Sequence, residues 1–429
     1  MKKLTSWGKF PIIDAELVSP YSRQELIDNE LKGIGRGLGR SYGDSALSER
    51  VIKTNNLNHF IDFNNEVGLL HCEAGVSLAE ILSVFVPKGW FLPVSPGTKF
   101  VTVGGAIASD VHGKNHHIEG SFCDHVKSLK LVVLNKEIFC SREENADLFY
   151  ATCGGMGLTG VISEAIFSLK PIKSSYINQK VIKAKNLEMV LDLFDKYKES
   201  SYSVAWIDCL STGKNFGRSL LMLGEHADIG DLCVHKDSIL NLPCDMPSML
   251  LNRFNIQSFN SVYYNKQIKK AVCSKVHYQS FFYPLDGIKN WNRMYGANGF
   301  TQYQFVIPKQ DGKRGLTEIL MAIAKSKQGS FLSVLKVFGK ENKNLLSFPI
   351  EGYTLALDFK MNDKLFALLD RLDEIVEKYG GRLYLSKDVR MSESNFKAGY
   401  PRWKEFQMVR KKLGADKVYN SLQSKRIGL

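Results

Sequence analysis

The chain has 429 residues and a formal net charge of +13, with 24% charged and 44% hydrophobic residues. This length suits two domains, and the apolar content without any low-complexity tract or repeat excludes a disordered or solenoid protein. Eight cysteines occur without a C-x-x-C pair, which argues against a metal cluster or a disulfide scaffold, so we predict no metal. The charge favours anionic partners, but no zinc-finger, helix-turn-helix or RNA-binding signature is present, and we predict no nucleic-acid partner.

No stretch of the sequence is apolar over the length that spans a membrane. The first residues, MKKLTSWGKFPII, lack the apolar core of a signal peptide, and scattered cysteines fit a reducing compartment. We expect a cytoplasmic protein with at most a peripheral contact with the inner membrane.

The first part of the chain alternates short β-rich runs with glycine turns. Strands are expected at residues 68–72, 128–134 and 160–169. After the first of these, Ser77 is a candidate N-cap for the helix LAEILSVFV, in which leucine, isoleucine and phenylalanine recur at helical spacing. Strands mixed with short helices predict an α+β cofactor domain over residues 1–172.

From about residue 173 the pattern changes to longer amphipathic helices that alternate with strands. Helices are expected at NLEMVLDLFDKYKES, around residues 316–324 and over 364–378, and strands at VAWIDCL, SLLMLGE, FTQYQFVIP, FLSVLKVFG and GYTLALDF. This alternation predicts an antiparallel sheet covered by helices on one face, in a substrate-binding domain over residues 173–380. Residues 381–429 are expected to form a tail that returns to the cofactor domain.

Two segments of the second region need separate interpretation. Residues 240–275 mix apolar and basic residues without a regular period, which is typical of either a mobile lid or an ordinary helical insertion. Near the C-terminus, WKEFQMVRKKLG predicts a helix that ends at Gly414. Its cluster of Arg410, Lys411 and Lys412 favours a solvated helix face over a binding patch.

Three glycine-rich segments in the first 172 residues indicate a large bound ligand. The first, KGIGRGLGRSYGDS, has glycine at every second position from Gly33 to Gly39, so that successive backbone N–H groups can surround a pyrophosphate. The second is PGTKFVTVGGAIASDVHGKNHH, which ends in cationic and hydrogen-bonding side chains. The third, GGMGLTG, matches G-x-G-x-x-G but leads into the strand-like VISEAIFSLKPI, and no acidic residue follows at the required distance. We therefore expect no nicotinamide-binding Rossmann unit.

Together with the later segments QYQFVIP and GGRLYLSKD, these glycine segments resemble a known family over nearly the whole chain. The combination is similar to the decaprenylphosphoryl-β-D-ribose 2′-oxidase family, within the vanillyl-alcohol-oxidase class of FAD flavoproteins with a PCMH-type FAD-binding domain. The resemblance implies FAD as cofactor and a two-domain α+β fold. It also implies that the N-terminal part and the C-terminal tail together form a bipartite FAD-binding domain, with the substrate domain between them.

The resemblance further implies which residues hold FAD. Positions in the first glycine segment would surround the diphosphate, and positions in the second would line the adenosine and the flavin. Some covalent relatives carry histidine in a G-H-S turn where this chain has Gly43, Asp44 and Ser45, so we expect FAD to bind non-covalently. The implied FAD contacts are Gly35, Arg36, Gly37, Leu38, Gly39, Arg40, Ser41, Tyr42, Gly43, Gly97, Thr102, Val103, Gly104, Gly105, Ser109, His112, Ile162 and Tyr384.

For catalysis, the resemblance implies Lys387 beside the flavin and the substrate phosphate, together with Tyr42 and His112. A buried lysine loses basicity, so Lys387 can act in proton transfer as well as electrostatics; we favour electrostatics and leave the base open. Paired glutamines on one strand face indicate either a solvent face or a polar pocket floor. A tryptophan in VAWIDCL favours core packing over substrate stacking. The implied substrate contacts are Lys114, Trp206, Gln302, Gln304 and Lys336.

The chain departs from the family pattern at one strand of the pocket. In mycobacterial members the strand matching GYTLALDF carries a cysteine near the flavin, whereas this chain has Ala356. Thr354 replaces an asparagine on the same strand. We therefore expect an altered pocket wall.

The resemblance implies FAD-dependent oxidation of the 2′-hydroxyl of a polyprenylphosphoryl-β-D-ribose to the 2′-keto sugar. This would be the first half of a two-enzyme epimerisation that makes precursors of cell-envelope polysaccharide. The implied partners are the polyprenyl-phosphate sugar and an NAD(P)H-dependent short-chain reductase. Two alternatives stay open: a soluble alditol or aldonolactone oxidase on the same fold, and a catalytically inactive flavin-binding subunit.

Overall fold

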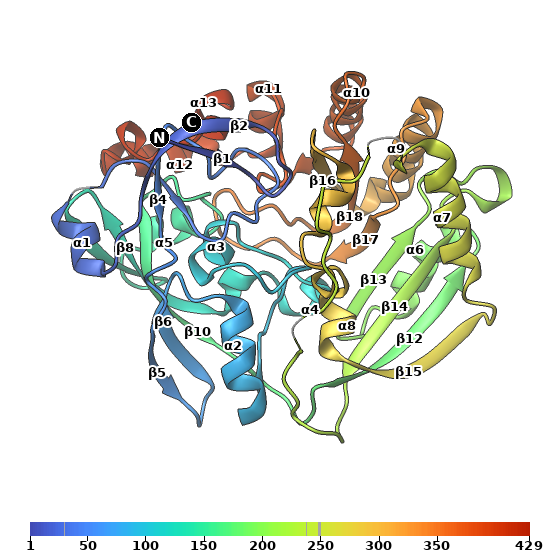
Figure 1. Cartoon of the computed structure of the whole chain (residues 1–429), viewed down its shortest axis with the longest axis horizontal. Coiled ribbons are helices and arrows are strands. Elements are labelled where there is room, and N and C mark those ends of the chain that lie inside the picture. Colours follow the sequence, from blue (N-terminus) through green and yellow to red (C-terminus); the bar gives the residue numbers. More distant parts are fainter. Residues whose placement is uncertain (30, 237, 248–249) are drawn as a thin grey trace.

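The computed structural model describes residues 1–29, 31–236, 238–247 and 250–429 as two halves that lie side by side (Figure 1). The left half in the figure holds a four-stranded and a five-stranded sheet, and the right half is built on one eight-stranded sheet. Mixed sheets and helices in two parts confirm the expected α+β class. None of the described helices combines the length and the apolar composition needed to cross a bilayer.

The left half is organised around two sheets of different type. The smaller has the order β1-β2-β4-β3, and β4 runs parallel to both of its neighbours. The larger is antiparallel with the order β5-β6-β10-β8-β9, and its three central strands are those expected from the sequence. The strands are β1 Lys2–Thr5, β2 Ile12–Val18, β3 Ile34–Arg36, β4 Arg50–Lys53, β5 Phe60–Asn64, β6 Leu69–Glu73, β8 Val126–Val133, β9 Lys136–Ser141 and β10 Val161–Ser168, with a separate pair, β7 Trp90–Phe91 and β11 Lys170–Pro171.

The helix predicted after Ser77 is α2 (Leu78–Phe85). The Ser77 hydroxyl accepts from the Glu80 N–H at 3.2 Å, and the Glu80 carboxylate accepts from the Ser77 N–H at 2.8 Å. This capping box and the buried apolar face confirm the prediction. The other helices of the first 172 residues are α1 Arg23–Asp28, α3 Val103–Ala108, α4 His116–Glu119 and α5 Ala146–Thr152.

The eight-stranded sheet of the right half is antiparallel throughout, with the order β15-β12-β14-β13-β17-β18-β16-β19. One face packs against α6 (Leu187–Lys196), α9 (Gly312–Ser326) and α10 (Leu365–Lys378) through leucine, isoleucine and valine side chains. The predicted sheet with helices on one face is confirmed. Its strands are β12 Tyr176–Ala184, β13 Tyr202–Ile207, β14 Ser219–His226, β15 Ala271–His277, β16 Phe300–Pro308, β17 Ser333–Phe338, β18 Gly352–Lys360 and β19 Arg382–Leu383.

The ambiguous stretch 240–275 contains a helix and an edge strand. Helix α7 (Arg253–Asn265) begins where the Asn252 side chain accepts from the Asn255 N–H at 3.0 Å. Strand β15 then pairs with β12 at the free edge of the large sheet. The helical insertion is therefore the better description of this stretch, of which residues 248–249 lie outside the described part. A short helix, α8 (Tyr278–Phe282), follows.

The interpretation of Arg410 as part of a solvated face is wrong. Arg410 lies on α12 (Trp403–Lys412) but is fully buried, and its guanidinium donates to the backbone oxygens of Leu158 and Tyr419, both at 3.0 Å. Three consecutive basic residues point to different sides of a helix, and only Lys411 and Lys412 are exposed here. The Leu158 carbonyl lies 252 residues away along the chain, so its contact with Arg410 leaves no local signal in the sequence.

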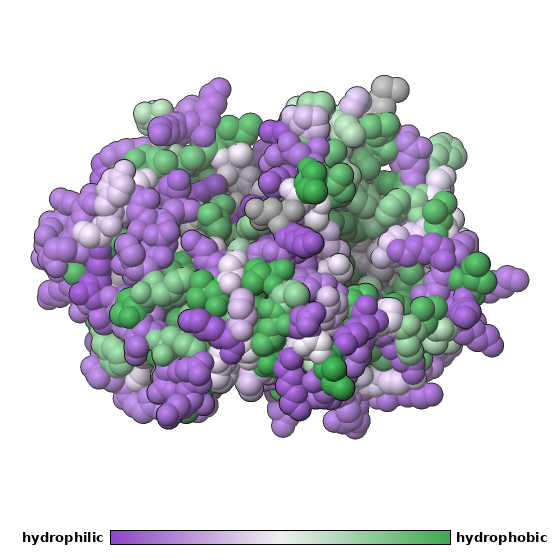
Figure 2. Space-filling view, turned by 60° about the horizontal axis from the view of Figure 1, so that its bottom comes forward, coloured by the Kyte–Doolittle hydropathy of each residue, from purple (hydrophilic) through white to green (hydrophobic). Residues whose placement is uncertain are grey.

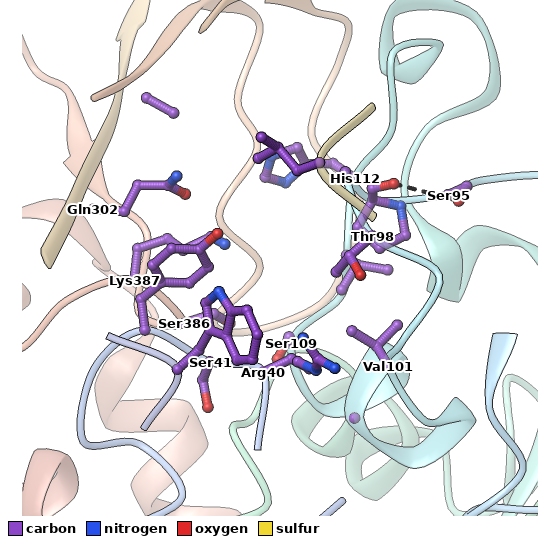
Figure 3. A pocket seen from close by; sticks show the side chains of 18 of the residues that line it. Arg40, Ser41, Ser95, Thr98, Val101, Ser109, His112, Gln302, Ser386 and Lys387 are labelled. Carbon is purple, nitrogen blue, oxygen red and sulfur yellow. Dashed lines mark hydrogen bonds between the residues drawn. The ribbon is translucent and has the colours of Figure 1, made fainter. Parts of the chain in front are cut away.

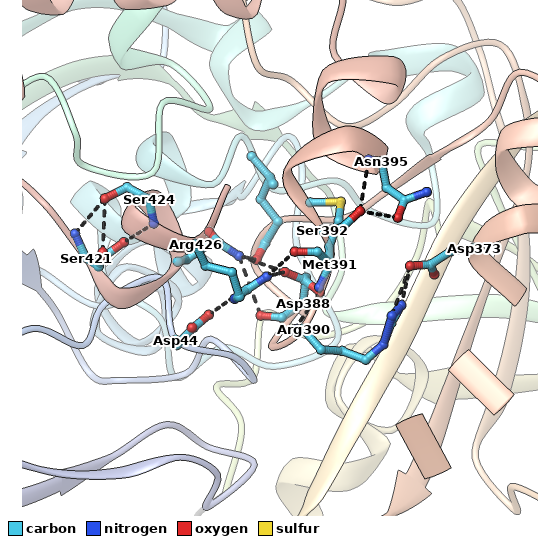
Figure 4. A network of polar contacts seen from close by, with 12 residues as sticks. Asp44, Asp373, Asp388, Arg390, Met391, Ser392, Asn395, Ser421, Ser424 and Arg426 are labelled. Carbon is cyan, nitrogen blue, oxygen red and sulfur yellow. Dashed lines mark hydrogen bonds and ion pairs between the residues drawn. The ribbon is translucent and has the colours of Figure 1, made fainter. Parts of the chain in front are cut away.

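Among the contacts between the C-terminal tail and the N-terminal half is an ion pair made by one arginine, which also pairs within the tail (Figure 4). Arg426, at the end of α13 (Leu422–Arg426), pairs with Asp44 at 2.7 Å and with Asp388 at 3.0 Å. Burial raises the pKa of Asp44 to about 6, and the Arg426 guanidinium opposes that rise. The tail also contains α11 (Glu393–Gly399). The domain boundaries at residues 172 and 380 stay a prediction, and β19 adds the start of the tail to the large sheet.

We expect Arg426→Leu to lower the free energy of unfolding by about 3–5 kcal/mol at mildly alkaline pH, because it leaves buried carboxylates without a partner. Without the guanidinium, the pKa of Asp44 in the folded state lies still further above its unfolded value. The folded variant then takes up a proton at a higher pH than the unaltered protein does, so the loss shrinks as the pH falls towards about 6, where Asp44 of the unaltered protein also becomes protonated. Urea unfolding at two pH values measures this difference.

The matched control is Arg50→Leu, because Arg50 and its partner Glu16 are both about half exposed. Removing that pair is expected to cost less than about 1 kcal/mol. An Arg426→Leu loss that is independent of pH, or as small as the Arg50→Leu loss, would contradict the role given to this contact.

Candidate active site

A cavity of about 810 Å³ lies between the two halves, where the first and second glycine segments face the uncovered side of the large sheet (Figure 3). Its size suits a cofactor together with part of a substrate. The predicted residues that line it are Gly35, Arg36, Gly37, Leu38, Gly39, Arg40, Ser41, Tyr42, Gly97, Thr102, Gly104, Gly105, Ser109, His112, Lys114, Ile162, Trp206, Gln302, Gln304, Lys336, Tyr384 and Lys387.

Two predicted cofactor contacts do not reach the cavity. A Cβ atom on Gly43 would lie 1.5 Å from the backbone oxygen of Asp388, so this glycine lets the C-terminal tail pack against the first glycine segment. Val103, the first residue of α3, is buried in the apolar core. Both positions therefore support the cavity from behind.

The first glycine segment presents a row of unpaired donors to the cavity. Within the described part of the chain, no backbone N–H from Gly37 to Ser41 has an acceptor. A Cβ atom added to Gly35, or to Gly97 in the second segment, would meet nothing within 4 Å and would project into open space. Unpaired N–H groups beside side-chain-free surfaces fit an extended diphosphate, so these residues fit FAD.

The two arginines of the first segment have different surroundings. The Arg36 guanidinium donates to the backbone oxygens of Thr5 at 2.6 Å and Ala46 at 3.2 Å, so it braces the segment from beneath and its expected help to the diphosphate is not supported. Arg40 lies over the Trp7 ring, 4.0 Å from the ring centroid. Burial lowers the pKa of Arg40.

The second glycine segment forms a short helix that the sequence did not reveal. In α3 the Thr102 hydroxyl accepts from the Gly105 N–H at 3.1 Å. Gly104 sits so close to the Ala74 side chain that an added Cβ would lie 3.0 Å from it. The glycines therefore allow close packing against the five-stranded sheet, and the segment then delivers His112 to the cavity.

His112 contributes a neutral ring with one unsatisfied nitrogen. Burial lowers its pKa well below the usual value, so the imidazole carries no charge. Its Nε2 lies 3.0 Å from the Gln304 amide nitrogen, which also donates to the Thr354 hydroxyl at 3.2 Å. Because Nε2 accepts, the ring proton resides on Nδ1, which has no partner among the described residues. His112 is thus a hydrogen-bond donor, which does not support a role as base.

Three partly buried lysines converge on the same cavity, and the Lys114 ammonium donates to the backbone oxygen of Phe281. Burial lowers the pKa of Lys336 to about 8 and that of Lys114 to about 7. Lys387 lies over the Tyr42 ring, with Nζ 3.7 Å from the ring centroid, and burial lowers its pKa as well. In the part of the chain that the structure describes, no carboxylate lies within ion-pair distance of Lys114 or Lys336.

Asp358 is a neighbour of Lys387 that sequence reasoning missed. Its carboxylate accepts from the Gln302 amide at 2.5 Å and from the Tyr295 hydroxyl at 3.2 Å. Burial raises the pKa of Asp358, and the charge of Lys387 opposes that rise. An acidic residue inside the apolar strand GYTLALDF was the signal that could have revealed it.

An apolar wall forms the other side of the cavity, and it too was missed. Trp206 belongs to this wall rather than to a closed core: its indole donates to the Phe331 oxygen at 3.0 Å, and its ring packs on Tyr263 of α7. A segment after α8 covers the cavity and is held by Asp286, which accepts from Thr98 at 2.7 Å. No local motif marks these residues, which include Phe259, Phe281, Leu285, Ile288, Trp291, Met294 and Val334.

The neighbouring histidines have structural partners. His116 Nδ1 accepts from the Gly339 N–H at 3.1 Å, and His117 Nε2 lies 2.9 Å from the Ser200 oxygen. Across the described ranges, no group of three or more His, Cys, Asp or Glu side chains is arranged to hold a metal ion.

Residues 25–139, which contain the first and second glycine segments, match the FAD binding domain family. The fold and the site thus define an FAD-dependent oxidoreductase. The chain is 35% identical to decaprenylphosphoryl-β-D-ribose oxidase of Mycolicibacterium smegmatis, over 100% of this chain and 98% of that protein. It belongs to the decaprenylphosphoryl-β-D-ribose oxidase family.

The chain is also similar to more distant relatives. The chain is 20% identical to L-gulono-1,4-lactone dehydrogenase of Mycobacterium tuberculosis over 98% of both chains. It is 26% identical to Delta(24)-sterol reductase of Mus musculus over 33% of this chain and 27% of that protein. The resemblance inferred from the motifs is confirmed.

We expect Gly97→Leu to reduce FAD retention at least about tenfold, because its side chain would occupy the space beside the unpaired N–H groups. The fold should persist, since a Cβ at this position meets no atom of the protein. Flavin absorbance per chain after purification measures retention, and circular dichroism checks the fold. Gly287→Leu is the matched control, because its Cβ is equally free but lies outside the cavity. Equal flavin contents in the two variants would contradict the assignment.

Proposed function

We propose that this protein oxidises the 2′-hydroxyl of a polyprenylphosphoryl-β-D-ribose to the 2′-ketone. The observation that carries the proposal is the convergence of Lys114, Lys336 and Lys387 beside the glycine segments. Buried ammonium groups are costly unless an anion meets them, so the cavity requires a negatively charged ligand next to the cofactor. A sugar phosphate satisfies that requirement. The decaprenylphosphoryl-ribose oxidase to which the chain is similar bears a name that indicates such a substrate.

Different groups of cavity residues bind chemically different parts of the substrate. The lysines hold the phosphate, Gln302 binds the sugar hydroxyls, and the apolar wall accepts the start of the prenyl chain. Oxidation removes a hydride and a proton from the C2′ carbinol, and FAD, when bound, accepts the hydride. Burial keeps the Tyr42 hydroxyl protonated by raising its pKa, so Tyr42 serves as a donor or as a surface for Lys387. We assign electrostatic stabilisation to Lys387 and leave the proton acceptor open.

The alternatives fit the cavity less well. An alditol or an aldonolactone carries no charge and would leave the buried lysines without an anion. A flavin-binding subunit without catalysis would not need cations and hydrogen-bond donors directed at one point. Non-covalent FAD follows from Asp44 at the position of the covalent histidine, and acid precipitation that releases the flavin would support it. An NAD(P)H-dependent short-chain reductase that reduces the keto sugar is the proposed partner, and the inner face of the membrane is the proposed location.

We expect Lys387→Met to slow anaerobic bleaching of the flavin by polyprenylphosphoryl ribose at least about 100-fold, because the cation beside the reacting sugar is lost. The flavin itself should stay bound. Stopped-flow absorbance measures the rate, and Lys397→Met, at a partly exposed lysine of α11, is the control. No bleaching of the unaltered protein by any phosphoryl pentose would reject the oxidase proposal, whereas loss of flavin from Lys387→Met would reassign Lys387 to cofactor retention.

The proposal also predicts the pH dependence. Phosphate binding needs the ammonium form of Lys336, whose pKa burial lowers to about 8. In the free enzyme that form is lost as the pH rises above this value, and the ammonium form of Lys114, whose pKa burial lowers to about 7, is lost first, so kcat/KM should fall from about pH 7 upward. Bound phosphate stabilises the ammonium, so kcat should fall only at higher pH. In Lys336→Gln we expect kcat/KM to be at least about tenfold lower, with a shallower fall. An unchanged pH profile in the variant would exclude phosphate binding by Lys336.

A further inference from the structure

The chain around α7 has an unusual charge pattern. From Met246 to Leu285 the sequence contains no aspartate or glutamate, whereas cations recur throughout. The basic residues in this interval are Arg253, Lys266, Lys269, Lys270 and Lys275. An acid-free basic stretch of this length favours an anionic surface as its partner.

The outer face of α7 exposes large apolar side chains to water. Phe254 is 77% exposed and Val262 is 70% exposed, two turns apart on one side of the helix. The opposite side carries the buried Ile256 and Asn260, and the Asn260 amide donates to Asp208 at 2.8 Å. The helix is therefore anchored by its inner side, and its outer side is not needed for folding.

The apolar surface continues into the turn and the edge strand after α7. Ile268 is 92% exposed, and the exposed Lys269 and Lys270 follow it directly. Strand β15 lies at the free edge of the sheet and is exposed over most of its length. In the space-filling view, hydrophobic residues reach the surface among hydrophilic ones on the side that carries α7 and β15 (Figure 2).

We propose that Phe254, Val262, Ile268, Lys269 and Lys270, here called the docking face, bind the surface of an anionic lipid bilayer. Separated apolar side chains flanked by lysines suit a lipid interface, which adapts to them, whereas a protein interface has a continuous, closely packed core. Anionic headgroups supply a negative charge for Lys269 and Lys270.

The docking face lies beside the cavity, and what membrane binding would achieve there rests on the proposed function. Phe259 and Tyr263, on the adjacent side of α7, line the apolar wall of the cavity. A bilayer that contacts the outer side of α7 would therefore be separated from the cavity only by the thickness of this helix. A substrate anchored by a prenyl chain could then present its phosphoryl sugar to the lysines while the chain stays in the lipid.

The test uses the full FAD-loaded chain and no substrate. Flotation with phosphatidylcholine vesicles, with and without phosphatidylglycerol, should show binding only to the anionic vesicles, and added salt should weaken it. Lys269→Gln with Lys270→Gln should lower the partition coefficient by roughly 10- to 30-fold. Phe254→Ser with Val262→Ser should lower it at least about tenfold.

The matched controls remove the same groups elsewhere. Lys411→Gln with Lys412→Gln, and Val67→Ser with Met408→Ser, alter exposed residues on the other half of the molecule and should leave the partition coefficient unchanged. Absence of binding, equal binding to neutral vesicles, or equal losses in control and docking variants would overturn the proposal. With a short-chain, water-soluble substrate, all four variants should bleach the flavin at the unaltered rate. Because docking is measured without turnover, its failure and a failure of the proposed oxidation are distinguishable.

Discussion

The segment from Tyr384 to Asp388 is the constraint on which the site depends, because it is bonded to both halves at once. The Tyr384 N–H donates to Gln304 on the large sheet at 2.9 Å, and its hydroxyl donates to the Ser109 oxygen at 2.9 Å. The Ser386 oxygen accepts from the Tyr42 N–H at 2.9 Å, and Asp388 is held by Arg426. Lys387 thus stands where the glycine segment, the sheet and the tail meet, and its place is fixed by all three.

This arrangement places positively charged side chains in a largely enclosed cavity. Burial lowers the pKa of each of the three cavity lysines, which means that the protein destabilises their charged forms by enclosing them. Asp358 offsets part of that cost for Lys387, while Lys114 and Lys336 have no comparable carboxylate among the described residues. An anion in the cavity would offset this cost, which is why the proposed substrate is one that carries a phosphate.

Residues in compact motifs could be predicted from the sequence, because their spacing expresses local backbone geometry. Ser77 with its capping box and the strand after GGMGLTG are of this kind, as are the cavity glycines Gly35 and Gly97. Features that depend on contacts with distant parts of the chain could not be predicted from the sequence. Arg410 is buried against the distant carbonyl of Leu158. Gly43 makes room for the tail instead of the cofactor, and the apolar wall is assembled from several elements that share no motif.

The departure of β18 from the family pattern changes the polar geometry of the site and leaves its charge alone. The Gln304 amide nitrogen donates to both Thr354 and His112, so the hydroxyl of Thr354 helps to orient the amide that places the His112 proton on Nδ1. Ala356, on the same strand, lines the cavity with a small side chain. Thr354 is the cross-strand partner of Lys336 in the register of β17 and β18, whereas Ala356 is paired with Val334. Variation at Thr354 therefore alters the surroundings of both His112 and Lys336, and variation at Ala356 alters the shape of the cavity wall.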